Sequence, residues 1–316
     1  MRKATVAGIA GLAVLVGTIT AQAADPESCK NVRFADVGWT DITSTTALTS
    51  VVLEGLGYAP SNQVLAVPVT YTSLKNKDID VFLGNWMPTM EADLRPYVDD
   101  KSVEIVEPAN LEGAKYTLAV PAYTFDAGLQ SFADIAKFKD QLDGKIYGIE
   151  PGNDGNRLIL GMIEGNQFDL TGFELVESSE QGMLSQVERA VSRNEPIVFL
   201  GWEPHPMNAK YPMKYLAGGD DVFGPNFGGA TVYTNIRAGY LAECPNVGTL
   251  VKNLRFTLPM ENEVMGAILN DAKDPAVAAK EWLVANPAAW EGWLAGVTTF
   301  DGQPGLDAVK KSLGVM

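Results

Sequence analysis

The sequence predicts an α/β protein with two lobes that face each other. Strand-like and helix-like segments alternate along most of the chain, which is typical of mostly parallel sheets covered by helices. An apolar strand that ends in VFLGNW at Trp86 is nearly repeated as VFLGW at Trp202, far along the chain. Because open α/β sheets hold ligands beyond their strand ends, these two edges indicate one site between two lobes. The alternative is two unrelated core tryptophans, since tryptophan is highly buried on average.

The size and composition of the chain are those of a globular protein. It has 316 residues, of which 46% are hydrophobic and 20% charged, enough for one large or two medium domains. The formal net charge is −15, and it becomes more negative still if Arg2 and Lys3 are removed with the N-terminus. Because such an acidic chain repels nucleic acid, we expect a neutral or cationic partner.

The N-terminus has the pattern of a secretory signal peptide over residues 1–24. Basic residues precede an apolar run from Val6 to Val16, and Ala21-Gln22-Ala23 matches a small-x-small cleavage site. A membrane anchor is the alternative, but glycines interrupt the run, which is shorter than a spanning helix needs. We therefore expect an exported mature chain.

In an exported chain the two cysteines, Cys29 and Cys244, are expected to form a disulfide. Two unpaired thiols are the alternative. No lipoprotein-type sequence surrounds Cys29, so we expect no lipid anchor there. By chain-entropy reasoning, a bond between positions this far apart stabilises the fold by roughly 5 kcal/mol.

The first strands and helices have recognisable boundaries. Residues 31–37 form a short strand, and a Thr/Ser-rich entry leads into a helix over residues 40–56 that Gly57 ends. The next strands are expected over residues 63–70 and 79–83. A helix over residues 88–98 then begins just after Trp86, with acidic side chains in its early turns, where the helix dipole favours them.

The middle of the chain forms a second series of strands and helices. We expect strands over residues 116–120, 145–149, 173–176 and 197–200, and helices over 131–142, 157–164 and 181–191. After Trp202 the chain reads as connections, including a glycine-rich region over 218–229, and helices then begin at Asn246, Pro259 and Pro275. This order predicts a first lobe made of residues 25–113 plus 213–316, and a second lobe, 114–212, inserted into it. Both cysteines then lie in the first lobe.

The sequence holds little material for catalysis or for a cofactor. His205 is the single histidine, so we expect neither a Ser-His-Asp triad nor a His-rich metal site, and we assign this residue to a hinge hydrogen bond or to packing. Phosphate-binding glycine motifs are missing, which removes support for a nucleotide cofactor. The GNDGN turn at residues 152–156 begins a helix, where Asn153 or Asp154 holds a polar ligand group or, alternatively, simply caps the helix.

Four aromatic residues stand at predicted strand ends, namely Trp39, Trp86, Tyr116 and Trp202. If they meet between the lobes, their ring faces form a cage that suits a quaternary ammonium ion, which is cationic and has no N–H group to satisfy. Asp41 adds a negative charge near the cation or, alternatively, caps the following helix. By contrast, a helical C-terminal stretch contains three tryptophans that we expect in the core: Trp282, Trp290 and Trp293.

Five segments, VGWTD, FLGNWMP, KYTLAVP, GIEPGNDGN and FLGWEPH, resemble the periplasmic substrate-binding proteins of ABC transporters for quaternary amines. Within that family they look closest to the choline-binding members. The resemblance covers essentially the whole mature chain and implies the type II fold, in which two lobes joined by two crossover strands close over a ligand. It also implies a periplasmic location and a membrane permease as partner. The ligand-binding residues that it implies are Trp39, Asp41, Trp86, Tyr116, Asn153 and Trp202.

Among quaternary amines, choline fits these residues best. Asp41 would repel the carboxylate of glycine betaine or proline betaine, whereas Asp41 and Asn153 suit the hydroxyl of choline. We expect acetylcholine to bind more weakly than choline. The alternatives are a betaine-binding protein, a secreted enzyme that acts on choline esters through Asp or Glu, and an adhesive or structural exported domain. Because the sequence lacks a nucleophile paired with a base, we expect no enzyme.

Overall fold

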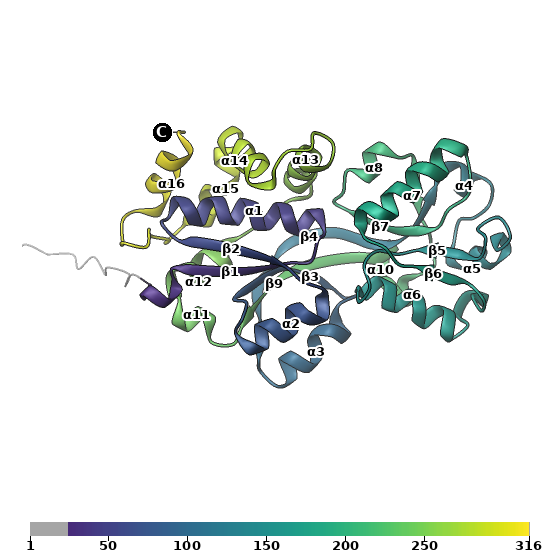
Figure 1. Ribbon diagram of the computed structural model, residues 1–316, viewed down its shortest axis with the longest axis horizontal. Helices are drawn as coiled ribbons and strands as arrows, with labels where there is room; N and C mark the ends of the chain where they lie inside the picture. The colour runs from purple at the N-terminus through teal and green to yellow at the C-terminus, as the bar shows by residue number, and fades with distance from the viewer. Residues whose placement is uncertain (1–24, 316) are drawn as a thin grey trace, which may run out of the picture.

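The computed structural model describes residues 25–315, and these residues contain one nine-stranded sheet. The strand order is β2-β1-β3-β9-β4-β7-β5-β6, and β8 pairs with β4 off this path. A group of parallel strands lies at each end of the sheet, and antiparallel pairs join the two groups in the middle. Figure 1 shows helices gathered around each end, which makes two lobes. The signal peptide expected over residues 1–24 lies outside the described residues.

The first lobe is built on three parallel strands, β1 (Asn31–Asp36), β2 (Ala59–Val64) and β3 (Val81–Met87). Helices α1 (Thr40–Gly55), α2 (Val67–Asn76) and α3 (Glu91–Asp99) connect and cover them. Gly84 lies inside β3 and does not end the strand, contrary to expectation. A Cβ atom at this position would lie 2.7 Å from the side chain of Ile42, so glycine is needed for α1 to pack against β3.

Two long antiparallel strands connect the lobes, which confirms the predicted pair of crossover strands. They are β4 (Val103–Pro121) and β9 (Gly229–Arg237), and their register runs from Val103 opposite Arg237 to Lys115 opposite Gly229. Beyond Lys115, β4 leaves β9 and pairs with β7 of the second lobe. One strand therefore belongs to both ends of the sheet (Figure 1).

The second lobe is built on β5 (Lys145–Tyr147), β6 (Glu174–Val176) and β7 (Phe199–Glu203), which pair in parallel, with the short β8 (Met213–Tyr215) at the edge of β4. Its two longest helices are α6 (Asp154–Glu164) and α7 (Glu180–Arg193). Shorter helices lie in it, namely α4 (Ala122–Asp126), α5 (Phe132–Ile135) and α8 (Met207–Lys210), and two more, α9 (Asp220–Phe223) and α10 (Pro225–Gly228), contact α6 and β4, respectively.

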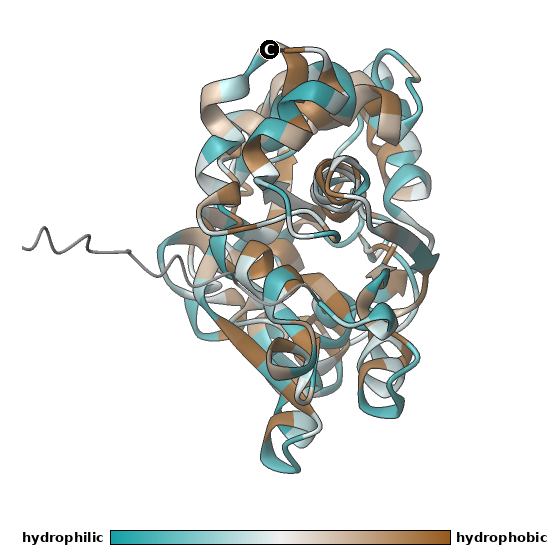
Figure 2. Ribbon diagram, turned by 90° about the vertical axis from the view of Figure 1, so that its left-hand side faces the viewer, coloured by the Kyte–Doolittle hydropathy of each residue, from teal (hydrophilic) through white to brown (hydrophobic). Residues whose placement is uncertain are grey.

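The C-terminal part of the chain is helical, as expected, and covers the first lobe. It comprises α11 (Tyr240–Glu243), α12 (Pro245–Asn253), α13 (Leu258–Leu269), α14 (Pro275–Ala285), α15 (Pro287–Trp290) and α16 (Gly305–Leu313). Helix α1 contacts α13, α14 and α16. Figure 2 looks nearly along α1, and the C-terminal helices lie above it. No helix within residues 25–315 is both long and apolar enough to cross a membrane.

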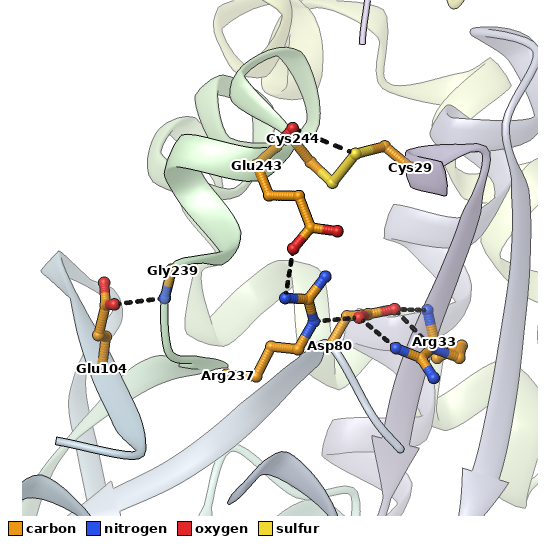
Figure 3. Close-up of polar contacts among 8 residues, drawn as sticks. All are labelled: Cys29, Arg33, Asp80, Glu104, Arg237, Gly239, Glu243 and Cys244. Carbon is orange, nitrogen blue, oxygen red and sulfur yellow. Dashed lines mark hydrogen bonds and ion pairs between the residues drawn. A yellow bond between two sulfur atoms is a disulfide. The ribbon is translucent and has the colours of Figure 1, made fainter. Parts of the chain in front are cut away.

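A disulfide and a chain of ion pairs join the N-terminal and C-terminal segments of the first lobe, as Figure 3 shows. Cys29 and Cys244 form the predicted disulfide, with their Cα atoms 5.6 Å apart. Next to it, Arg237 donates to Asp80 and to Glu243 at 2.7 Å each, and Arg33 also binds Asp80. Burial alone would raise the pKa of Asp80, but the hydrogen bonds from the two arginines hold that pKa below its usual value.

Several elements differ from expectation. Residues 67–70 belong to helix α2 and not to a strand, because Pro68 occupies the first turn of the helix, where proline is tolerated. Strand β9 replaces part of an expected connection, since a glycine-rich segment hides its start. The helix expected over residues 131–142 is reduced to α5 and one 3₁₀ turn, Ala136–Phe138. The residue boundaries given above for the two lobes stay a prediction.

Candidate ligand-binding site

A cavity lies where the two lobes meet, and its walls contain all six predicted site residues. Ile149 and Asp154 complete the lining. The lining residues are Trp39, Asp41, Trp86, Tyr116, Ile149, Asn153, Asp154 and Trp202. The fold thus brings together side chains from β3, β4, β7 and the first turns of α1 and α6.

The first lobe supplies an acidic group between two tryptophans. Trp39 is the residue immediately before α1, and Asp41 lies in the first turn of that helix. Asp41 is not the N-cap that the sequence allowed, because the N-cap position belongs to Trp39. Trp86, on β3, donates its indole Nε1–H to Asp41 Oδ2 at 3.1 Å. This bond fixes the ring and the carboxylate relative to each other.

The second lobe supplies an aromatic pair and an amide. Tyr116 on β4 stands directly opposite Trp202 on β7. The Tyr116 hydroxyl donates to Asn153 Oδ1 at 2.8 Å, and Asn153 also caps α6 by accepting from the backbone N–H of Asn156. A Cβ atom at Gly155 would lie 2.1 Å from the Tyr116 hydroxyl, so the glycine of the GNDGN turn makes room for this tyrosine.

The aromatic rings meet edge to face around the cavity. The ring centres of Trp86 and Tyr116 are 6.1 Å apart with planes at 62°, and those of Tyr116 and Trp202 are 6.3 Å apart with planes at 81°. These are favourable geometries for aromatic pairs. The tryptophans and Tyr116 are all buried, with exposed fractions of 6% or less.

The cavity is strongly acidic for a buried site. Burial, and then the charge of Glu180, raises the pKa of Asp41 to about 8. Burial also raises the pKa of Glu150 to about 7 and that of Asp154 to about 6. Among the described residues, Asp41 Oδ1 and Asp154 Oδ2 are buried without a hydrogen-bond partner. No Lys, Arg or His lines the cavity within the described part of the chain. The site can therefore gain stability from a cation.

Several hydrogen bonds run from one lobe to the other beside the cavity. Trp39 donates its Nε1–H to Glu150 Oε1 at 2.9 Å. Thr40 donates its backbone N–H and its hydroxyl to Glu180, at 2.8 and 2.5 Å. On the outer side, Arg157 donates to the backbone carbonyl of Thr89 at 3.1 Å and pairs with Asp93. No sequence pattern points to Glu150 or Glu180, because only the packing of the lobes brings them here.

His205 does not form a catalytic pair with a nucleophile. Its Nε2 lies 3.2 Å from Glu180 Oε1, and its Nδ1 accepts from the backbone N–H of Met207 at 2.9 Å. The Thr40 hydroxyl contacts the carboxylate and not the imidazole. The carboxylate therefore stands between hydroxyl and histidine, so the imidazole is not in place to take the hydroxyl proton.

The chain matches, over residues 30–285, the family described as the substrate-binding domain of the ABC-type glycine betaine transport system. It belongs to this family. Members are the substrate-binding components of transporters. The glycine betaine/carnitine transport binding protein GbuC of Listeria monocytogenes serotype 1/2a (strain 10403S) is 31% identical over 163 residues, which are 52% of this chain and 53% of the relative.

Two solved structures are more similar. An ABC-transporter choline-binding protein in complex with choline is 67% identical, with a TM-score of 0.90, and the match covers 92% of this chain and 100% of the other. An ABC-transporter choline-binding protein in an unliganded semi-closed conformation is also 67% identical, with a TM-score of 0.84 and coverage of 91% and 100%. The predicted fold and family are thereby confirmed.

Proposed function

We propose that this chain captures choline between its lobes and delivers it to the membrane permease of an ABC transporter. The observation that carries the proposal is a buried cavity with aromatic walls and carboxylates that no Lys, Arg or His of the lining neutralises, within residues 25–315. The similarity to a choline-binding protein solved with choline supports it. On this proposal the six ligand-binding residues are those predicted from the sequence.

The aromatic walls provide much of the binding free energy that a receptor needs. Each cation–π contact contributes roughly 0.5 to 2 kcal/mol, so four rings contribute on the order of 2 to 8 kcal/mol in total. Micromolar affinity corresponds to about 8 kcal/mol. The anionic form of Asp41 adds a charge interaction that strengthens in a cavity of low dielectric constant.

The polar groups of the cavity suit a hydroxyl that donates one hydrogen bond. Asp41 Oδ1 and Asp154 Oδ2 are acceptors without a partner among the described residues. Asn153 has already committed its oxygen to Tyr116 and to the backbone of Asn156, and its Nδ2 donates to Asp154. We therefore assign the ligand hydroxyl to a carboxylate acceptor, with Asn153 donating its second Nδ2 hydrogen to the hydroxyl oxygen.

Betaines are the second candidate, because the family description and the Listeria relative name glycine betaine. A betaine carboxylate would lie near Asp41 and Asp154 with no Lys, Arg or His in the described lining of the cavity to compensate. We expect choline to bind most tightly, acetylcholine more weakly, and glycine betaine and proline betaine poorly. An enzyme that cleaves choline esters is disfavoured, because His205 contacts a carboxylate and not a nucleophile.

The proposed location is the periplasm, after removal of residues 1–24. The signal-peptide pattern and membership in a family of transporter substrate-binding domains support it. We expect the mature protein to be found in the periplasmic fraction with the N-terminus beginning near Asp25. Recovery of the intact chain in the membrane fraction would contradict this location.

A titration of the mature protein with choline, acetylcholine and glycine betaine in parallel tests the function. Trp39, Trp86 and Trp202 line the cavity, so binding should change the intrinsic tryptophan fluorescence. We expect saturation at micromolar choline and little change with glycine betaine. Tighter binding of glycine betaine would overturn the ligand assignment, and the release of choline from an ester would favour an enzyme.

A further inference from the structure

The first residue of α7, Glu180, belongs to the second lobe but contacts the start of α1 in the first. It is 1% exposed. One oxygen accepts the backbone N–H of Thr40 at 2.8 Å, and the other accepts the Thr40 hydroxyl at 2.5 Å and lies 3.2 Å from His205 Nε2. Neither Glu180 nor His205 lines the cavity. A buried carboxylate outside the binding site therefore joins the lobes.

We infer that Glu180, held by His205, is a positioning residue that fastens the closed lobes and sets the rate at which the ligand leaves. The inference rests on the proposed function for its ligand. It assigns to the single histidine of the chain the task of orienting this carboxylate.

The hydrogen bonds around His205 fix which ring nitrogen carries the proton. The backbone N–H of Met207 donates to Nδ1 at 2.9 Å, so Nδ1 is an acceptor and carries no proton. The proton of the neutral ring is then on Nε2, which donates to Glu180 Oε1. The Glu180 carboxylate thus accepts three hydrogen bonds, two from Thr40 and one from His205, and each of its oxygens accepts at least one. Only a side chain with an acceptor at both oxygen positions satisfies this arrangement.

The contact connects both halves of the aromatic cage. Thr40 stands between Trp39 and Asp41 in the sequence, so a bond to Thr40 holds the start of α1, where Trp39 is the N-cap and Asp41 lies in the first turn. On the other side, the imidazole of His205 packs against Trp202, with ring centres 4.9 Å apart. Figure 1 shows α1 and α7 on opposite sides of the join between the lobes. Closing the lobes therefore sets the cage and the contact together.

The location favours a negative charge. The carboxylate of Glu180 lies at the N-terminus of the 16-residue helix α1, where the helix dipole attracts an anion. The contact exists only when the lobes are together, since its two sides come from different lobes. Removing it should therefore affect release of the ligand more than its entry.

Stopped-flow fluorescence with choline on the mature protein tests the inference. In Glu180→Gln the amide nitrogen must face either a Thr40 donor or the His205 Nε2–H, so one contact becomes donor against donor. We expect the dissociation rate constant to rise at least tenfold, with the association rate constant changed less than threefold. The matched control is Glu188→Gln on the same helix, whose exposed side chain pairs with Lys210 away from the cavity; it should leave both rate constants unchanged.

A conservative pair at position 205 separates orientation from packing. In His205→Gln the side-chain amide reaches the position of Nε2 and can donate to Glu180, whereas in His205→Asn it is too short. We expect the glutamine variant to release choline more slowly than the asparagine variant. Thr40→Val, which removes one hydroxyl donor and keeps the shape, should speed release several-fold and serves as a second test if Glu180→Gln fails to fold.

A measurement without ligand tests the role of Glu180 independently of which ligand the protein binds. Spin labels at Asp140→Cys and Lys311→Cys, both exposed and in different lobes, report the interlobe distance, because both native cysteines are used in the disulfide. We expect the fraction of closed molecules to fall in Glu180→Gln. An unchanged closed fraction together with unchanged choline release would overturn the inference. If wild-type protein fails to bind choline, the proposed function is wrong, and the spin-label distances still decide the role of Glu180.

Discussion

Two groups of tryptophans in this protein look alike by burial and differ in what their indole N–H groups contact. In the C-terminal helices, Trp290 donates to the backbone carbonyl of Leu283 at 2.8 Å and Trp293 to that of Arg255 at 3.1 Å. At the cavity, Trp39 donates to Glu150, and Trp86 donates to Asp41. Trp290 and Trp293 are thus satisfied by neutral backbone groups, whereas Trp39 and Trp86 donate to acids whose pKa values burial raises.

The difference shows why burial alone does not separate a core from a site. Trp290 is fully buried and Trp86 is 3% exposed, so their exposed fractions do not tell the two kinds of tryptophan apart. A core residue is already satisfied by its neighbours, and its loss leaves a hole. A site residue is packed beside charge that the protein itself does not neutralise, and its loss should weaken binding more than folding.

The largest expected effect belongs to the core. In Trp290→Ala we expect the free energy of unfolding to fall by about 3 to 5 kcal/mol, because a fully buried ring is replaced by a cavity. Urea denaturation measures this change. The choline affinity of the folded fraction should stay within threefold of wild type. A tenfold loss of choline affinity in this variant would mean that the core and cavity tryptophans do not differ in function.

Removing the charge at the cavity should have the next largest effect. In Asp41→Asn we expect choline to bind about 30-fold more weakly, which corresponds to about 2 kcal/mol. The variant keeps an acceptor for Trp86 Nε1 and removes the acid group that ionises when the cation binds. Because the pKa of Asp41 is about 8, the side chain is largely protonated near pH 7 in this structure, so stability should change by less than about 1 kcal/mol. Calorimetry with choline and a thermal melt measure the two effects.

One ring of the cage gives a smaller effect on binding. In Trp202→Ala we expect at least tenfold weaker binding of choline, since one cation–π contact and one wall of the cavity are lost. The loss of stability should be smaller than in Trp290→Ala, because the ring borders open space. Unchanged affinity, measured by titration calorimetry, would remove Trp202 from the site.

The pH dependence of binding is the smallest of these effects. A bound cation favours ionised Asp41 and Glu150 and lowers their pKa values from about 8 and about 7, so binding releases protons in this window. We expect choline affinity to rise several-fold from pH 6 to pH 8 and then to level off. The groups that act on Asp41 include Glu180 and the Trp86 N–H, and the charge of Asp41 in turn helps to raise the pKa of the buried Glu261.

The same shifts predict how the ligand-free protein responds to pH. A carboxyl whose pKa is raised by folding contributes stability below its unfolded pKa and loses it as pH rises through the folded pKa. Asp41 and Glu150 should therefore make the folded protein progressively less stable as pH rises from their ordinary pKa values of 3.8 and 4.5 to about 8 and about 7, and the loss should level off above pH 8. Melting curves at several pH values, with Asp41→Asn as the control, measure this loss of stability.

For the binding experiment, a choline affinity independent of pH would contradict the acidic character of the cavity.

The residues that the sequence predicted for the aromatic cage lie beside short, recognisable motifs, and the structure brings them to one cavity. Trp86 and Trp202 follow apolar strand residues and a glycine, and the turn at Asn153 begins a helix as expected. The two lobes were expected from the order of elements, and the disulfide from the export that the N-terminal sequence pattern predicts. Such features are local, so a single sequence contains them.

The parts that the sequence did not predict depend on contacts between distant segments. Glu150 and Glu180 look like ordinary surface acids until the packing of the lobes buries them beside α1. Strand β9 is hard to predict because its start is rich in glycine, although its later residues favour a strand. Trp282, expected in the core, is only partly buried and donates to Glu263 at the surface.

The most direct test of the cavity compares choline with the uncharged alcohol in which a carbon atom replaces the nitrogen. The two molecules share shape and hydroxyl, and only choline carries the charge that the aromatic faces and Asp41 attract. By titration calorimetry we expect choline to bind at least a hundredfold more tightly, a difference of about 2.7 kcal/mol. Affinities within threefold of each other would mean that the cavity tryptophans form only an apolar pocket, and that they differ from the buried tryptophans of the C-terminal helices in position alone.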